Sequence, residues 1–135
     1  MKSFKIVNDI NYLIMERFGK YIQEVEKNTT CEQFLEENKK FTSQIKNNKK
    51  TMGEWKIHKA LSNLKRFMIY KLLERKPMCT CALAKVFSVS DGTITHHLKI
   101  LEKAGLIMGK KEGYFTRYYT TKNMITQLTQ TLILQ

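Results

Sequence analysis

Residues 88–107 read SVSDGTITHHLKILEKAGLI, a pattern that predicts a tight turn followed by a capped helix. Ser90 or Asp91 caps this helix, because a short polar side chain accepts hydrogen bonds from the free N–H groups of a helix start. Three apolar residues then recur at helical spacing and indicate the buried face of the helix: Ile94, Leu98 and Leu101. Gly105 stands where a helix-ending residue in the left-handed conformation belongs.

Two further helices are expected before this turn. The first begins at Glu54 and ends before Pro77, because the residue ahead of a proline is pushed out of helical geometry. The second is short and covers about residues 80–87. The inward-facing residues of the two helices are Trp55, Leu61, Leu64, Met68 and Leu72, followed by Leu83, Ala84 and Phe87.

The periodicity changes after Gly105. The segments LIMGKK and YFTRYYTT flank Glu112-Gly113 and are rich in β-branched and aromatic residues, which predicts a two-stranded hairpin. From about Thr121 the spacing becomes helical again, through Met124, Ile125, Leu128, Leu132 and Gln135.

The first part of the chain predicts two amphipathic helices. One covers residues 4–26, and the other begins at Thr30, which forms a capping box with Gln33, and runs to about residue 46. The segment KNNKKTMG, residues 46–53, is polar, charged and ends in glycine, so we expect a linker there.

A helix, a short helix, a tight turn, another helix and a hairpin follow one another in the order of a winged helix-turn-helix. The expected fold class is therefore mainly α with a small β-hairpin wing. We expect three parts: a helical extension over residues 1–53 that serves dimerisation, a DNA-binding domain over 54–120, and a dimerisation helix over 121–135.

In a helix-turn-helix the second helix lies in the major groove of DNA, and the wing contacts the backbone or a neighbouring groove. The predicted DNA-binding residues lie on that helix and on the hairpin: Ser90, Asp91, Thr93, Thr95, His96, His97, Lys99, Lys110, Lys111 and Arg117. The adjacent histidines point about 100° apart, so they do not readily chelate one ion. We expect His96 to face DNA, and His97 to pack inside or to touch a phosphate.

The positive charge lies mostly in the second part of the chain. Residues 54–135 hold 14 basic and 5 acidic residues, against 10 and 7 in residues 1–53. A positive field of this kind attracts a polyanion, of which duplex DNA is the first candidate.

The run from Leu61 to Leu106 resembles the ArsR/SmtB family of metalloregulatory repressors. Three motifs carry the resemblance: the helix from Leu61 to Leu73, the segment CTCALA from Cys79 to Ala84, and the segment from Ser90 to Leu106, with EGYFTRYY after it. The resemblance covers about residues 61–120. It implies a homodimer paired through its terminal helices, and a repressor that leaves DNA when an inducer binds.

In that family the Cys-x-Cys motif binds thiophilic ions together with one or more further cysteines. The resemblance thus implies an effector such as arsenite, cadmium, lead or zinc at Cys79 and Cys81, and no cofactor is required. The nearby third cysteine of the arsenic sensors is absent, so Cys31 is the remaining thiol that would complete the site. The family's other metal site needs Asp and His on the last helix, and neither occurs after Glu112.

The two thiols have several readings. Residues i and i+2 of one helix face nearly opposite ways, so Cys79 and Cys81 can share a ligand only if Cys79 lies in the extended segment before the helix. They then form a metal or metalloid sensor or a reversible redox pair. With no effector role for these thiols, the chain is an effector-free regulator. Cys31 lies on an apolar stripe, which also fits a core cysteine.

The remaining features exclude other classes of protein. The N-terminal residues lack the apolar run of a signal peptide, and no stretch approaches the roughly 20 apolar residues of a membrane span. We expect a soluble cytoplasmic protein that binds double-stranded DNA and no membrane. No nucleophile elbow, phosphate-binding glycine loop or carboxylate pair points to an enzyme. The alternative from another class is a winged helix that binds protein within a transcription complex.

Overall fold

The computed structural model describes residues 2–133 of the chain. It divides into two compact units, Met1–Asn48 and Lys49–Gln135, and each unit is considered by itself. The predicted helix over 121–135 is described as far as Ile133, and Gln135 lies outside the described residues, as do the side chains of Met124 and Leu128. Within residues 2–133, none of the helices combines the length and the apolar content needed to cross a lipid bilayer.

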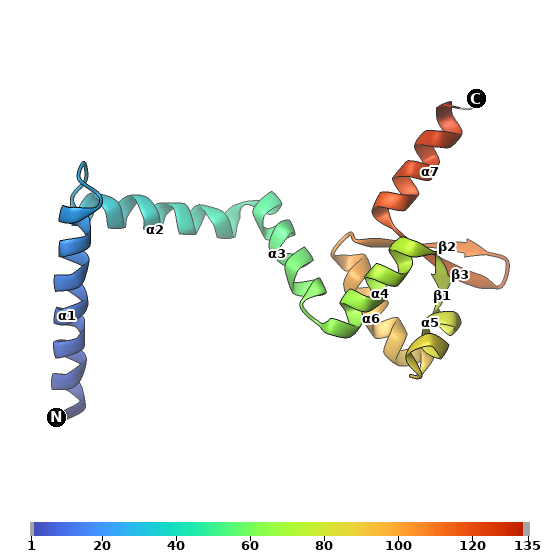
Figure 1. Ribbon diagram of the computed structural model, residues 1–135, viewed down its shortest axis with the longest axis horizontal. Coiled ribbons are helices and arrows are strands. Elements are labelled where there is room, and N and C mark those ends of the chain that lie inside the picture. The colour runs from blue at the N-terminus through green and yellow to red at the C-terminus, as the bar shows by residue number, and fades with distance from the viewer. Residues whose placement is uncertain (1, 134–135) are drawn as a thin grey trace. The chain divides into compact units, whose positions relative to one another are not determined.

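The first unit consists of two helices, α1 (Lys2–Glu24) and α2 (Cys31–Asn47). The predicted capping box is present, since Thr30 Oγ1 accepts from the backbone N–H of Gln33 and the Gln33 side chain accepts from that of Thr30. The helices meet near their connecting turn (Figure 1), where the ring of Phe34 lies 5.7 Å from that of Phe18. Among the described side chains of this unit only Ile22 is buried.

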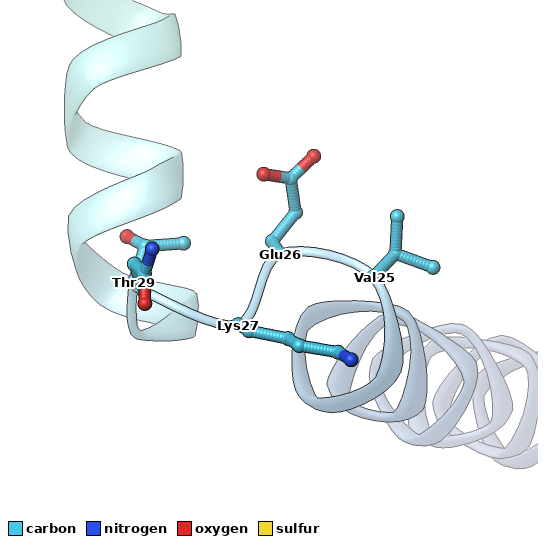
Figure 2. A pocket seen from close by; sticks show the side chains of 5 residues that line it. Val25, Glu26, Lys27 and Thr29 are labelled. Atoms are coloured by element: carbon cyan, nitrogen blue, oxygen red, sulfur yellow. The ribbon is translucent and has the colours of Figure 1, made fainter.

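The turn between α1 and α2 borders a hollow of about 400 Å³, lined by Val25, Glu26, Lys27, Asn28 and Thr29. Figure 2 shows the labelled side chains of Val25 and Glu26 pointing to one side of the turn, with that of Lys27 running below them. The Tyr21 hydroxyl donates to Glu26 Oε1 over 2.7 Å and fixes the carboxylate beside the end of α1.

The second unit begins with two helices where the sequence predicted a linker and a single helix. Helix α3 covers Lys49–Leu61, so residues 49–53 of the expected linker are helical, and α4 covers Leu64–Arg75. Lysine and methionine favour helices, and one glycine costs a helix only about 1 kcal/mol. The break falls at Ser62-Asn63, because Asn63 Oδ1 accepts from the backbone N–H of Arg66 and starts a new helix.

The helix-turn-helix follows as predicted. Helix α5 covers Thr80–Phe87 and helix α6 covers Asp91–Lys103, joined by a turn in which Ser88 adopts the left-handed conformation at φ 52°. The N-cap of α6 is Ser90, the first of the two predicted alternatives, and its Oγ accepts from the backbone N–H of Thr93. Gly105, at φ 76°, has the left-handed geometry that its position predicted.

The predicted hairpin is one part of a three-stranded antiparallel sheet. Strands β2 (Ile107–Glu112) and β3 (Phe115–Thr120) form the hairpin, and β1 (Met78–Cys79) pairs with the other edge of β3. The register places Met78 opposite Tyr118 and Cys79 opposite Arg117. The hairpin projects beyond the helices of its unit, and α7 (Thr121–Ile133) leaves the end of β3 (Figure 1).

One hydrophobic core holds the second unit together. Its fully buried large side chains come from α4, α5, α6 and β2: Ile69, Leu73, Leu83, Ile94, Leu98, Leu101 and Ile107. Three of them are the stripe predicted for α6, so this helix turns its other side outward. The core thereby fixes which residues of α6 face solvent.

Candidate nucleic-acid interface and thiol pair

Helix α6 presents a polar outer face. Asp91, Thr93, His96 and Lys99 are exposed, and they surround the capped start of the helix. Thr95 is half-buried, and its hydroxyl donates to the backbone oxygen of Asp91 over 2.8 Å. The exposed side chains are of the kinds that bind base edges and phosphates, whereas Thr95 is engaged with its own helix.

His97 lies on the inner flank of α6. It is partly buried, and its Nδ1 is shielded from solvent without a hydrogen-bond partner among the described residues. Burial lowers the pKa of His97, and the positive charges of Arg66, His96 and Lys65 lower it further. Two roles were expected for His97, packing inside the protein or touching a phosphate, and a neutral imidazole in this position suits packing.

The hairpin carries cations on both faces. Lys110 and Lys111 are exposed and adjacent in β2, so their side chains leave opposite faces of the sheet. The strands are joined by Gly113, at φ 63°, and by Tyr114, whose side chain is 99% exposed. This fully exposed aromatic ring at the tip of the wing was not among the residues predicted for the site, because its only signal in the sequence was a bulky residue beside a turn glycine.

Arg117 differs from the two lysines because its charge is paired. Its Nη1 donates to Glu112 Oε2 over 3.0 Å, and the Tyr119 hydroxyl donates to Oε1 of the same carboxylate over 2.6 Å. These two hydrogen bonds lower the pKa of Glu112, the bond from Tyr119 more strongly. The guanidinium of Arg117 also donates to the carbonyl oxygen of Pro77. Arg117 thus ties β3 to the segment before β1 and is less available to DNA than Lys110 or Lys111.

Cys79 and Cys81 have the geometry that a shared ligand requires. Cys79 is the last residue of β1 and the N-cap of α5, with extended backbone, while Cys81 lies in the first turn of the helix. The sulfur of Cys79 accepts from the backbone N–H of Ala82 over 3.4 Å. Cys79 is half-buried and Cys81 is exposed, and both thiols are free.

The two sulfurs also interact with each other. A hydrogen bond from the Cys81 thiol lowers the pKa of Cys79, and the backbone N–H of Ala82 contributes in the same direction. The same hydrogen bond raises the pKa of Cys81. Both shifts favour a thiolate at Cys79 over one at Cys81.

The residues at the pair fit a thiophilic atom bound through two sulfurs. Cys31, the third thiol expected from the sequence, is half-buried at the start of α2 and belongs to the first unit. Within the part of the chain that the structure describes, no three or more His, Cys, Asp or Glu side chains gather as a metal site. The three-thiolate arrangement stays a prediction, while the two-sulfur pair is formed within one unit.

A hollow beside the thiols reaches the start of α6 and the tip of the hairpin. It has a volume of about 360 Å³ and is lined by Cys79 and Cys81, by Asp91 at the start of α6, and by Tyr114 at the tip of the hairpin. This neighbourhood could not be predicted from the sequence, because its members come from three separate segments of the chain.

Comparison with known proteins supports the helix-turn-helix interpretation of the second unit. Residues 64–108 match the family model described as bacterial regulatory protein, arsR family. An uncharacterised HTH-type transcriptional regulator of Methanocaldococcus jannaschii is 38% identical over 73 residues, which cover 53% of this chain and 82% of that protein. The arsenical resistance operon repressor of Bacillus subtilis is 39% identical over 61 residues, which cover 44% of this chain and 58% of the repressor.

A solved structure has the same fold. It is the homodimeric winged helix-turn-helix DNA-binding domain of a possible ArsR-family regulator of Mycobacterium bovis, 23% identical, with a TM-score of 0.51. The match covers 61% of this chain and 76% of that one. The second unit is thus a winged helix-turn-helix domain. The chain belongs to the ArsR family of transcriptional regulators, which agrees with the expectation that it is not an enzyme.

The hydrogen bond between the thiols predicts two separate pH profiles for alkylation. Cys79 should react with iodoacetamide at a lower pH than Cys81, because only the thiolate is nucleophilic. Replacing the donor in Cys81→Ala should move the Cys79 profile to higher pH, whereas Cys81→Ser, which keeps a hydroxyl donor, should move it less. Peptide mass spectrometry after timed alkylation measures both sites. Coincident profiles for the two cysteines would contradict the arrangement.

Proposed function

We propose that the protein is a sequence-specific regulator that binds double-stranded DNA in the cytoplasm and represses transcription. The observation that carries this proposal is the exposed polar face of α6, whose apolar stripe is locked in the core. His96 and Lys99 are its longest exposed groups and extend toward the major groove. Asp91 and Thr93 lie beside them at the start of the helix. The B. subtilis relative is a repressor by name, which supports the same direction of control.

Phosphate binding supplies most of the affinity in this proposal. Lys110 and Lys111 on the wing, together with Lys99 on α6, neutralise phosphates and release condensed counterions. The surplus of basic over acidic residues in residues 54–135 extends the positive field around these contacts. The Tyr114 ring at the wing tip lies against the sugar-phosphate backbone.

The regulator acts as a homodimer. Helix α1 exposes a broad apolar surface, formed by Ile6, Val7, Ile10, Leu13 and Ile14. On α7, Ile125, Leu132 and Ile133 are exposed. The first unit has a single buried residue among its described side chains, too little to stabilise two isolated helices. Pairing with a second copy buries these surfaces and places two recognition helices on a symmetric site.

An effector at Cys79 and Cys81 releases the protein from DNA. Both sulfurs line the hollow that also contains Asp91 and Tyr114, so an atom bound there displaces groups of the recognition helix and the wing. The effector is a thiophilic metal or metalloid, as the arsenical-resistance relative suggests. A coupling free energy of about 1–3 kcal/mol lowers DNA affinity enough for regulation.

DNA reading is tested by substitutions on α6. A duplex site is first selected from a random pool. The His96→Ala variant should then bind that site about fivefold or more weakly, because a base contact is lost. It should bind unselected DNA almost normally. Lys99→Ala should weaken binding to both kinds of DNA and reduce the slope of log K against log salt by about one.

The matched control is Lys71→Ala, which removes one positive charge from α4, where Lys71 is paired with Glu74. Its salt slope should stay at the wild-type value. If the wild type, Lys99→Ala and Lys71→Ala have equal salt slopes, or if no DNA is retained, the result favours the alternative, a winged helix that binds protein within a transcription complex.

Release by the effector is tested separately on the same protein–DNA complex. Arsenite or cadmium should lower the DNA affinity of the wild type by about 5- to 150-fold, followed by fluorescence anisotropy. The Cys79→Ser/Cys81→Ser double variant should bind the same DNA and ignore the ligand. Cys31→Ser shows whether a third thiol takes part. Equal release from wild type and double variant would exclude the thiol pair as the sensor.

A further inference from the structure

A hollow between α3 and the end of α6 has a largely apolar lining. Its volume is about 300 Å³, which is enough for a small organic molecule. The apolar residues that line it are Trp55, Ala60, Ile100 and Ala104. Ala60 is buried, whereas Trp55, the only tryptophan of the chain, is 51% exposed. We call this cavity the α3–α6 hollow, and its exposed indole is an apolar surface that the described residues leave uncovered.

Three lysines complete the lining of the α3–α6 hollow. They are Lys56, Lys59 and Lys103, and all three are exposed. Within residues 2–133 none of them forms an ion pair. The ammonium group of Lys59 lies 4.9 Å from the centre of the Trp55 ring. The hollow therefore combines an apolar surface with three positive charges.

The acidic residues next to these segments do not neutralise that charge. Glu54 and Glu102 are neighbours of lining residues in the sequence, but neither lines the hollow. Burial raises the pKa of Tyr118, and the negative charge of Glu102 raises it further, which places this carboxylate toward β3. On α6, Glu102 also lies about 100° around the helix axis from Lys103. The lysines are thus free to bind an anion.

Helix stability accounts for part of the lysine cluster. Lys59 and Lys103 lie in the last turns of α3 and α6, where a positive charge is favourable because the helix end carries a partial negative charge. This reason does not apply to Lys56, and it does not explain the exposed ring of Trp55. A ligand that has both an anionic and an aromatic part would contact all of these groups.

The α3–α6 hollow is separate from the thiol pair. It shares no lining residue with the hollow beside Cys79 and Cys81. Its α3 residues also precede residues 64–108, the segment that matches the arsR-family model. The hollow therefore depends on an element outside the matched segment.

We propose that the α3–α6 hollow binds an organic anion in which an aromatic ring carries a carboxylate. The ring lies against Trp55 and Ile100, and the carboxylate accepts hydrogen bonds from the lysines. A DNA phosphate would pair with the lysines but leave the indole uncovered, whereas a neutral aromatic molecule would leave the lysines unpaired. The anion is a second ligand of the regulator, bound on the helix that carries the proposed DNA-facing residues.

The test compares 2-naphthoate with 2-naphthamide, which has the same rings and no charge. Because the chain has one tryptophan, the indole N–H of Trp55 gives one resonance in proton–nitrogen NMR spectra, and its shift reports occupancy of the hollow. With the full chain, 2-naphthoate should shift this resonance saturably, with a dissociation constant of about 1 mM or lower. 2-Naphthamide should bind about fivefold more weakly or worse, because it lacks the charge-assisted hydrogen bonds.

The two parts of the hollow are tested by separate variants. Lys56→Gln/Lys103→Gln should weaken 2-naphthoate binding about fivefold and leave 2-naphthamide binding unchanged, because two ion pairs are lost. The matched control is Lys39→Gln/Lys40→Gln, which removes two charges from exposed residues of α2 and should keep the wild-type affinities. Trp55→Ala, followed through the ligand's own NMR signals, should lose both probes. The replaced residues are exposed, so circular dichroism should show an intact fold.

Three results would overturn the proposal: a Trp55 resonance that neither probe moves, equal affinities for the two probes, or the same loss of 2-naphthoate binding in the control. If 2-naphthoate does not bind and Lys56→Gln/Lys103→Gln lowers the salt slope of DNA binding, the lysines are phosphate contacts and the proposal is again wrong. None of these results bears on the thiol pair, which is tested on its own variants.

Discussion

The short pairing of β1 with β3 is the constraint on which the functional arrangement depends. Two residues, Met78 and Cys79, hold the segment before α5 against the strand that forms one side of the wing. Cys79 belongs at once to the strand and to the N-cap of the helix. A ligand bound to its sulfur therefore touches a residue that belongs to both the sheet and the start of α5. Helix α5 packs against α6.

The apolar core makes this junction able to transmit a change. Leu83 and Ala84 of α5 and Leu98 of α6 lie in one buried cluster. Close-packed side chains have few alternative arrangements, so a shift of α5 is passed to α6 rather than absorbed. On the opposite side of the junction, Arg117 links the wing to Pro77. In the proposed function, a ligand at the thiols therefore acts on both α6 and the wing.

Local patterns made much of the fold predictable. The cap at Ser90, the stripe of α6 and the left-handed Gly105 each depend on residues within one or two turns of chain. Strand β1 escaped prediction because two residues carry no periodicity and their partners lie about 40 positions away, at Arg117 and Tyr118. The break at Ser62-Asn63 was hidden by apolar residues that continue the helical spacing on both sides.

The site divides in the same way. The exposed face of α6 followed from its buried stripe. An extended conformation of Cys79 was stated as the condition for two thiols to share a ligand, and the structure meets that condition. The pairing of Arg117 with Glu112 depends on the register of the hairpin, and the hollow lined by Cys79, Asp91 and Tyr114 draws on three separate segments. Neither leaves a continuous signal in the sequence.

The first unit illustrates a further limit of local patterns. Its capping box and its helices were predictable. The spacing of the residues does not show what covers its apolar surface. Helix α2 contacts α1 near their connecting turn and leaves many apolar residues of α1 exposed. This exposed surface becomes visible only once both helices are in place. Association with a second copy is the simplest way to bury that surface.

Linkage between thiol occupancy and DNA binding is tested most directly by measuring the affinity of one ligand in two states of the protein. The dissociation constant of arsenite is determined for the free protein and for the protein saturated with its selected DNA. Because coupling between two sites is reciprocal, DNA should weaken arsenic binding by the same factor by which arsenic weakens DNA binding. Equal affinity in the two states would contradict a connection between the thiol pair and the recognition helix.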